Sequence, residues 1–304
     1  MMRSYNDSQI SAAFKYYRRK TVVVKYGGAA MQTSALKHCI INDIALLRAA
    51  GANVIVVHGG GPELTALQER LGLETKFIGG QRYTNAETME AALMALCGKV
   101  NKELVCLLES ESARTVGISG VDGSMLRCKK QASPDLGFVG EITKVRKDLL
   151  HVFMLDDIIP VVATVGIGDD GRMYNINADT AAGRIAAAVC ADYFLTLTDV
   201  PGVLSNVSDP TSVIREIRTS EIENLISTAR ITGGMIPKVR GIADAIGRGL
   251  KSATIVNGRI PHALMLALMS RGALERGERF DEEDGAGGTT IVGEKRNEGP
   301  NENE

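Results

Sequence analysis

The sequence predicts an α/β fold: a three-layer αβα sandwich in which helices cover both faces of a mainly parallel sheet. Two short apolar strands each run directly into a glycine cluster, VVVKYGG at 22–28 and VIVVHGGGP at 54–62. Strand-like and helix-like segments then alternate along most of the 304 residues. Repeated strand–helix units of this kind are typical of a parallel sheet with helices on its two faces.

The individual elements follow from the spacing of apolar residues. Apolar positions that recur every three to four residues predict helices at 32–50, 64–71, 86–108 with a break at Gly98, 178–189, 236–250 and 262–269. Pro62 suits the first turn of the second helix. Beyond the two strands that end in glycines, continuous apolar runs predict buried strands at 158–165, 193–197 and 253–256.

Three segments depart from this alternation. Between 114 and 147, short extended pieces alternate with Gly and Asp turns, which predicts antiparallel hairpins laid over the site as a lid. The polar tail at 294–304 is expected to be disordered. Near the start, helical spacing gives a small amphipathic helix with the apolar stripe Ile10, Ala13, Phe14 and Tyr17. This stripe packs either on its own domain or on another subunit.

Composition excludes several classes of function. The chain has 35 Lys and Arg against 36 Asp and Glu, so it lacks the basic excess of a nucleic-acid-binding protein. No apolar run approaches a membrane span, and polar residues at 6–9 interrupt any secretory signal. The five cysteines form no C-x-x-C pair and the four histidines lack metal-ligand spacing, which predicts reduced thiols in a cytoplasmic protein.

The two glycine clusters predict a binding site for a polyanion. Glycine removes the Cβ that would hold a ligand away from the backbone N–H groups, and ligands of open α/β sheets bind at the carboxyl ends of the strands. The P-loop motif and the protein-kinase motifs are absent from the sequence. One G-x-G-x-x-G match at 166–171 contains Asp169 and Asp170, which would repel a pyrophosphate, so we interpret it as a hairpin turn.

Four charged residues lie beside predicted turns and helix starts. Lys25 ends the first strand, Lys238 begins a helix after Gly233-Gly234, Asp179 enters a helix of small residues, and Arg82 lies in GGQRYT. Each has an ordinary structural explanation: a solvated lysine, a helix cap or a loop arginine. Together they fit phosphoryl transfer, which needs cations and amide donors to hold two anions in line. A carboxylate acceptor is already ionised, so no general base is required.

A series of motifs in one order makes the chain resemble the amino acid kinase family, and within it the branch that phosphorylates N-acetyl-L-glutamate. The resemblance covers about 21–292 and rests on VVVKYGG, VVHGGGPEL, GGQRYTNAETMEAALMALCGKVNKELV, DLGFVGEI, YNINADTAAGRIA, LTDVPGVL, GGMIPKV and IVNGRIPH. It implies an N-terminal oligomerisation helix at 1–20, an acetylglutamate-binding lobe at 21–177 and a nucleotide-binding lobe at 178–293.

The resemblance also implies roles for individual residues. Lys25 and Lys238 would stabilise the transferring phosphoryl group, with Asp179 holding both lysines. Binding of N-acetyl-L-glutamate would fall to Gly60, Gly61, Arg82, Asn175 and Asn177, and binding of ATP and its phosphates to Gly27, Gly28, Thr198 and Asp199. Magnesium would be carried by the ATP phosphates and water, with no metal ligand from the protein. Some positions depart from the family pattern and put substrate affinity in doubt: Ala29, Gln81, Tyr83, Asn85 and Val121.

Arginine-inhibited members of this family resemble the chain in having a helix before the first strand. The resemblance therefore implies a dimer or hexamer inhibited by arginine, with effector residues Tyr16, Glu275, Glu278 and Gly288. It leaves a PII-type regulator open as a partner, and it implies neither nucleic acid nor membrane. The alternatives are a kinase of the same fold for carbamate, aspartate, glutamate or UMP, and a catalytically silent arginine sensor.

Overall fold

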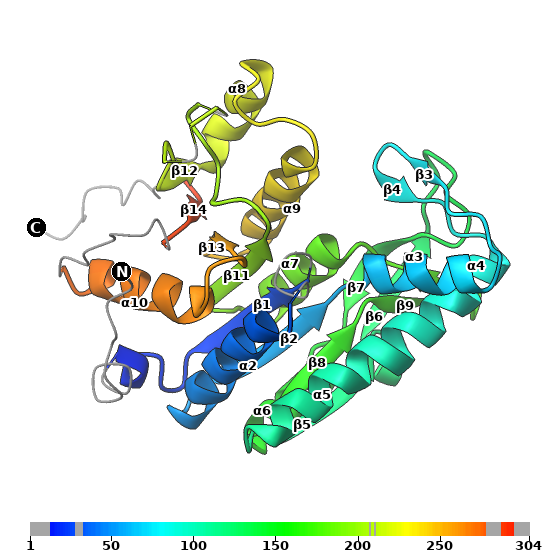
Figure 1. The fold of residues 1–304 in the computed structure, drawn as a ribbon, viewed down its shortest axis with the longest axis horizontal. Coiled ribbons are helices and arrows are strands. Elements are labelled where there is room, and N and C mark those ends of the chain that lie inside the picture. The colour runs from blue at the N-terminus through cyan, green and yellow to red at the C-terminus, as the bar shows by residue number, and fades with distance from the viewer. Residues whose placement is uncertain (1–12, 28–32, 207, 210, 278–286, 295–304) are drawn as a thin grey trace, which may run out of the picture.

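An eight-stranded sheet runs through the centre of the molecule, with helices on both of its faces (Figure 1). The computed structural model describes residues 13–27, 33–206, 208–209, 211–277 and 287–294. The strands follow the order β12 (Glu216–Arg218), β14 (Thr289–Val292), β13 (Ser252–Asn257), β11 (Tyr193–Thr198), β1 (Thr21–Tyr26), β2 (Asn53–His58), β8 (Ile159–Ala163) and β5 (Thr115–Ser119). From β13 to β5 all neighbours are parallel, and β14 is antiparallel to β13. The predicted α/β class and mainly parallel sheet are confirmed.

Alternate residues of the central strands enter two different cores. Val22 and Val24 of β1 pack with α2 (Ser34–Ala49), α5 (Asn101–Ser110) and α10 (Ala263–Glu275) on one face. Val23 packs on the other face with α6 (Asp148–Leu155), α7 (Ala178–Ala188), α8 (Ile222–Ser227) and α9 (Met235–Gly247). Because both faces are covered, these strands consist of unbroken apolar runs rather than an alternating pattern.

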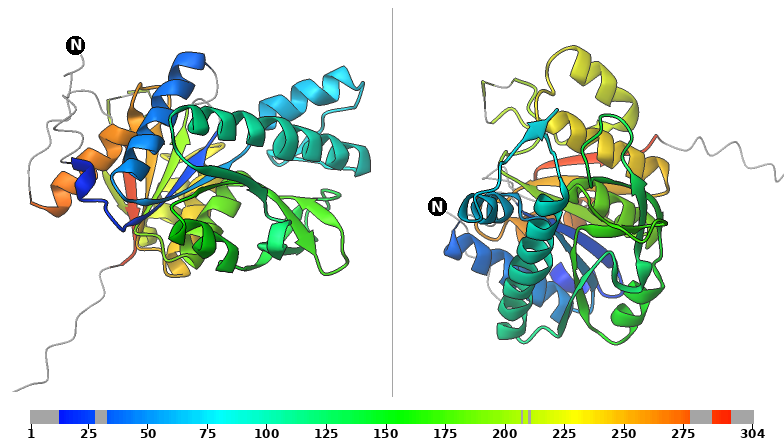
Figure 2. Two further views of the ribbon diagram at one scale, coloured as in Figure 1. Left: turned by 90° about the horizontal axis from the view of Figure 1, so that it is seen from below. Right: turned by 90° about the vertical axis from the view of Figure 1, so that its right-hand side faces the viewer.

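A second sheet of four strands lies beside the main one (Figure 2). Its order is β10 (Met173–Asn175), β9 (Val165–Gly168), β6 (Leu126–Lys130) and β7 (Gly140–Val145). The predicted antiparallel pairing is confirmed for β6 with β7 and wrong for 115–119, which is the parallel edge strand β5, and the role as a lid stays a prediction. A short half-buried edge strand has the same alternating pattern as a hairpin arm, so periodicity could not separate the two. The turn at 169–172 joins antiparallel β9 and β10, which confirms the hairpin interpretation of that segment.

Two other predicted elements differ from the structure. The apolar run 158–165 is divided at Thr164, because β8 belongs to the main sheet whereas β9 belongs to the second. The long helix does not break at Gly98. It runs from α4 (Ala86–Ala92) through the π-helical segment η2 (Leu93–Val100), which contains Gly98, into α5. Beside it lie α3 (Gly61–Arg70) and the hairpin of β3 (Phe77–Ile78) and β4 (Gln81–Arg82). The short 3-10 segments are η3 (Asp122–Ser124) and η4 (Thr219–Glu221).

The described part of the N-terminal segment packs on its own subunit. Residues 13–15 are helical, and Phe14 and Tyr17 are buried in the core that includes α10. The Tyr17 hydroxyl donates a hydrogen bond to the Leu268 carbonyl, and its ring meets that of Tyr193 edge-on at 5.0 Å. These contacts give the stripe a partner within the chain, and a contact with a second subunit stays a prediction. Residues 1–12, and the tail beyond Glu294, lie outside the described residues.

No helix among the described residues has both the length and the apolar character that a bilayer span requires.

Candidate functional site

The two glycine clusters meet at the carboxyl edge of the sheet. β1 and β2 are parallel neighbours in which Tyr26 pairs with His58, so the chain leaves both strands at the same level. The Gly59 N–H donates to the Tyr26 carbonyl at 3.3 Å and joins the two turns. Gly27 follows directly, whereas Gly28 lies outside the described residues.

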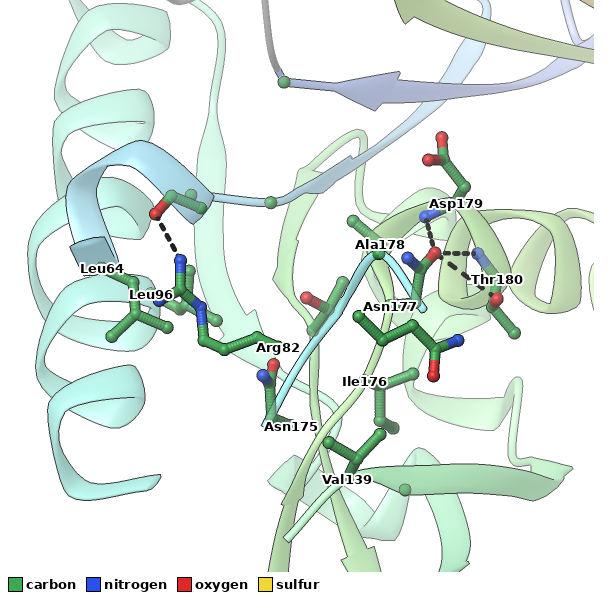
Figure 3. Close-up of a pocket in the computed structure, with 18 of the residues that line it drawn as sticks. Leu64, Arg82, Leu96, Val139, Asn175, Ile176, Asn177, Ala178, Asp179 and Thr180 are labelled. Atoms are coloured by element: carbon green, nitrogen blue, oxygen red, sulfur yellow. Dashed lines mark hydrogen bonds between the residues drawn. The ribbon is translucent and has the colours of Figure 1, made fainter. Parts of the chain in front are cut away.

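A cavity of about 590 Å³ opens at this edge. Figure 3 shows Arg82 on one side of the cavity and the segment from Asn177 to Thr180 on the other. Of the predicted site residues, the cavity is lined by Lys25, Gly27, Gly60, Gly61, Arg82, Asn175, Asn177 and Asp179. The predicted site residues on its wall come from four separate segments of the chain, which therefore share one binding space.

Asp179 bridges the two lysines. Its Oδ1 lies 3.1 Å from Lys25 Nζ and its Oδ2 lies 2.9 Å from Lys238 Nζ. Thr196, the neighbour of Lys25 in the β1–β11 register, donates to Oδ1 at 3.3 Å. Lys25 comes from β1, Asp179 from the first turn of α7 and Lys238 from α9, so three elements converge on one carboxylate. The N-terminus of α7 adds a favourable dipole for this negative charge.

The lysines set the protonation state of this carboxyl group. Burial raises the pKa of Asp179, but the positive charges of Lys25 and Lys238 and their hydrogen bonds outweigh burial and lower it to about 2. Burial lowers the pKa of Lys25, and Asp179 opposes that effect. Asp179 is thus ionised at neutral pH, and the cluster as a whole carries a positive excess for an anionic ligand.

A second cavity of about 510 Å³ adjoins the cluster on the side of α9. Lys238 lines it together with Thr198 and Asp199, whereas the partner of Lys238, Asp179, lines the first cavity. Thr198 Oγ1 accepts from the Val200 N–H at 3.1 Å and so shapes the turn after β11. Asp199 lies 3.7 Å from Arg259. The Asp179–Lys238 ion pair therefore stands at the boundary between the two cavities.

Arg82 is a nearly buried cation held by neutral groups. Its guanidinium donates to Gln68 Oε1, to the Gly61 carbonyl at 3.1 Å and to Thr65 Oγ1 at 2.7 Å. It also lies over the Phe77 ring at 4.8 Å. Burial lowers the pKa of Arg82, although a guanidinium stays protonated at any physiological pH. Within the described ranges, no carboxylate comes within ion-pair distance of it.

The two asparagines occupy the opposite wall. Asn175 Nδ2 donates to Thr84 Oγ1 at 3.3 Å. Asn177 is the N-cap of α7, where its Oδ1 accepts from the N–H groups of Asp179 and Thr180 at 2.9 and 3.1 Å. Its structural task is therefore to begin the helix that carries Asp179, and its amide nitrogen remains on the cavity wall.

Of the predicted effector residues that the structure describes, only two come together: Tyr16 and Glu275 meet beside Tyr193 at the start of β11, whereas Gly288 lies next to Ile255 of β13. The hydroxyl groups of Tyr16 and Tyr193 both donate to Glu275 Oε2, at 2.6 and 2.5 Å, and Arg271 Nε donates to Glu275 Oε1 at 2.9 Å. Gly288 has φ of +66°, and a Cβ there would come within 1.9 Å of the Ile255 carbonyl, so only glycine fits. Tyr16 and Glu275 thus meet directly, while Glu278 lies outside the described residues.

The positions that depart from the family pattern have structural tasks here. Gln81 Oε1 accepts from Gln131 at 3.2 Å on the cavity wall, and Asn85 caps α4 by accepting from the Thr88 N–H at 2.8 Å. Lys76 lies over the Tyr83 ring at 5.5 Å. Val121 packs against the apolar cluster that contains Leu64, Leu96 and Val165. Ala29 is not among the described residues.

A buried polar network behind the glycines has no signal in the local sequence pattern. His58 Nδ1 donates to the Gly59 carbonyl at 2.8 Å, and its Nε2 accepts from Asn101 Nδ2 at 3.1 Å. Asn101 also donates to the Val161 carbonyl at 2.9 Å. Burial lowers the pKa of His58 to about 4, so the ring is neutral and both nitrogens keep these roles. The fully buried Gln68, which contacts Arg82, was also missed.

No group of three or more His, Cys, Asp or Glu side chains suited to a metal ion occurs within the described part of the chain.

The comparisons with known proteins agree with this geometry. A model of the amino acid kinase family matches residues 20–257. Over 255 residues the chain is 46% identical to the acetylglutamate kinase of Brachyspira hyodysenteriae, covering 84% of this chain and 88% of that protein. It is 44% identical over 256 residues to the acetylglutamate kinase of Clostridium kluyveri, with 84% and 90% covered. The N-acetylglutamate synthase of Neisseria gonorrhoeae shares the fold, with a TM-score of 0.78, 20% identity, and 94% of this chain and 62% of that one covered.

Proposed function

The chain belongs to the amino acid kinase family, and we propose that it transfers the γ-phosphoryl group of ATP to the side-chain carboxylate of N-acetyl-L-glutamate. The products are ADP and N-acetyl-L-glutamyl 5-phosphate, an acyl phosphate, in the second step of arginine biosynthesis. Relatives at 42–46% identity that carry the name acetylglutamate kinase support this choice of substrate over carbamate, aspartate, glutamate or UMP.

The observation that carries the proposal is the position of the Lys25–Asp179–Lys238 cluster between two cavities. We assign the acceptor acid to the cavity with Arg82 and Asn175, and the nucleotide to the cavity with Thr198 and Asp199. Each lysine then faces the place where the two anions meet.

The reaction needs no proton transfer. An oxygen of the ionised carboxylate attacks the γ-phosphorus, the bond from that phosphorus to the bridging oxygen breaks, and ADP leaves with the electron pair. The two ammonium groups stabilise the charge that spreads over the transferred group, and Asp179 keeps them at fixed positions. The amides of Gly27, Gly60 and Gly61 supply neutral donors at the same edge.

Magnesium fits this site as a companion of ATP. Within the described ranges, no cluster of acidic, His or Cys side chains is suited to a metal, so the phosphate oxygens would supply the ligands. When bound, the ion neutralises phosphate charge. The lysines and the glycine amides perform the positioning that the protein contributes.

The assay compares phosphorylation of N-acetyl-L-glutamate with that of glutamate, aspartate and aminoadipate by coupled ADP release. We expect clear turnover with N-acetyl-L-glutamate and its loss in Lys25→Ala, with ATP binding retained. Preference for another acid would replace the substrate assignment. A folded protein that binds arginine but turns over none of these acids would instead be a silent sensor.

We further propose arginine inhibition of a hexameric enzyme in the cytoplasm. The contact between Tyr16 and Glu275 supports it, because the N-terminal segment and the end of α10 are joined there. Deleting the residues before Lys20 should leave an active dimer with little arginine response. An unchanged hexamer would contradict this assembly. A PII-type regulator remains a further candidate partner.

A further inference from the structure

The described residues around Arg82 provide no negative charge to pair with its guanidinium. Its side chain is 9% exposed, yet its hydrogen-bond partners are an amide oxygen, a backbone carbonyl and a hydroxyl. Buried cations in proteins are normally paired with carboxylates. Here the positive charge reaches the cavity without being neutralised by the described residues.

Gln68 is the residue that makes this arrangement rigid. It is fully buried, and its Oε1 accepts from Arg82 Nη1 and from Thr75 Oγ1 at 3.2 Å. Its Nε2 donates to the Glu74 carbonyl at 3.1 Å and to Thr88 Oγ1 at 3.1 Å. The Glu74 carbonyl can only accept and the guanidinium can only donate, so the orientation of the amide is fixed by its neighbours. Four hydrogen bonds hold one side-chain conformation.

The geometry leaves Arg82 able to bind one more group. A guanidinium has five N–H donors, and the three contacts to Gln68, Gly61 and Thr65 use three of them. Both Nη2 hydrogens are engaged, so the two that are left, one on Nη1 and one on Nε, cannot be shared by one carboxylate, and a carboxylate accepts a charge-assisted hydrogen bond from one of them. In the proposed reaction the side-chain carboxylate of the substrate is the acceptor, so the α-carboxylate is the group available to Arg82.

We propose that Gln68, assisted by Thr65, is a positioning residue that determines specificity for an acid with a second carboxylate. Because Gln68 is neutral, it orients the Arg82 guanidinium without neutralising its positive charge. That positive charge is then available to a carboxylate of the substrate. A glutamate in the same place would supply the counter-ion permanently. This inference rests on the proposed function for the identity of the substrate, but not for the state of Arg82.

The test measures carboxylate recognition directly. Binding of N-acetyl-L-glutamate and of its α-carboxamide is measured by calorimetry, together with kcat and KM for both. We expect Gln68→Glu, which keeps the shape of the side chain, to reduce the preference for the acid by about ten- to a hundredfold, the range of one charge-assisted hydrogen bond. The loss should fall mainly on Kd and KM, because Gln68 touches no reacting atom.

A second pair of variants covers the case in which Gln68→Glu does not fold, since its new oxygen would face the Glu74 carbonyl. Thr65 is only half-buried, so Thr65→Asp brings a carboxylate to Arg82 from the cavity side, and Thr65→Asn is its neutral match. Thr65→Asp should lose at least tenfold more preference than Thr65→Asn. Gln131→Glu adds the same charge to the cavity wall without a contact to Arg82, and should lower the preference less than Gln68→Glu.

The outcomes separate the two proposals. If the wild type binds the acid and its amide equally well, or if Gln68→Glu and Thr65→Asp keep the wild-type preference while folded, the inference is overturned. If the wild type binds the acid selectively but transfers no phosphate to it, and Gln68→Glu abolishes the selectivity, the proposed function fails while the role of Gln68 stands.

Discussion

The substitution Asp179→Asn removes the charge that holds two lysines together. The carboxylate oxygens lie 3.1 and 2.9 Å from the two ammonium groups, whose side chains are 10% and 18% exposed. Asparagine keeps the size of the side chain but can accept at one atom only, and its NH₂ group would face an ammonium. The two lysines would then repel each other with no anion between them.

The structure gives the size of the effect. The pKa of Asp179 falls from its ordinary value of 3.8 to about 2, which corresponds to about 2 kcal/mol of stability at neutral pH. Loss of one partner from a buried ion pair costs about 3–5 kcal/mol, and the 24% exposure of this side chain places it at the lower end. Removal of an electrostatic stabiliser typically reduces kcat about 10²–10³-fold. We therefore expect a destabilisation of about 2–3 kcal/mol and a fall in kcat of that order.

The sign of the pH dependence follows from the lowered pKa. The carboxylate stabilises the fold above pH 4, and this contribution is lost as the pH falls through the folded-state pKa near 2. The difference in unfolding free energy between wild type and Asp179→Asn should accordingly shrink on acidification. Urea unfolding at several pH values measures it, and coupled ADP release measures kcat.

Asp244→Asn is the matched control for this substitution. Asp244 forms an exposed ion pair with Arg248 on α9, so its loss should cost less than about 1 kcal/mol and leave kcat unchanged. A kcat for Asp179→Asn within threefold of the wild type, with unfolding unchanged, would refute the reasoning. The bridging carboxylate would then be neither a structural nor a catalytic requirement.

Two further predictions concern the glycine turn and a helix junction. Gly60→Ala places a Cβ 2.7 Å from Leu96 and should destabilise the fold by about 1–3 kcal/mol, whereas Gly61→Ala meets no atom within 4 Å and should unfold like the wild type; equal losses in urea unfolding would argue against this packing. The hydrogen bond to Asp43 raises the pKa of His262, so its stabilisation is full below about pH 6.5 and is lost as the pH rises through the folded-state pKa. His262→Asn should therefore cost more stability at pH 6 than at pH 9, and a pH-independent loss would exclude the charged pair.

The repeating parts of the fold could be predicted from local pattern alone. The strands 22–26 and 54–58 are buried on both faces, so an unbroken apolar run identifies them without tertiary information. The strand at 115–119 could not be placed in the same way. It pairs with β8, and the Asn101 and Lys102 side chains donate to its Ile118 and Gly117 carbonyls, so its contacts come from segments far away in the sequence.

The charged residues of the site could be predicted from the sequence, whereas the buried polar residues behind the glycine turn could not. Lys25, Asp179 and Lys238 each have an ordinary explanation at a strand end or a helix start, but their occurrence together in an ordered series of motifs singles them out. His58 and Asn101 lie inside ordinary strand and helix pattern, and only the folded chain shows that they bond to each other and fix the Gly59 carbonyl.

The π-helical segment contacts the glycine loop and also leads directly into the buried hydrogen-bond network behind it. Its Leu96 and Val100 side chains occupy the space where a Cβ at Gly60 would lie, at 2.7 and 3.1 Å, and it ends at Asn101. A regular α-helix would rotate the residues after the π-helical turn relative to those before it, so it could not present Leu96 to Gly60 and Asn101 to His58 together. The irregular turn is thus a condition for the glycine loop to be packed and hydrogen-bonded at once.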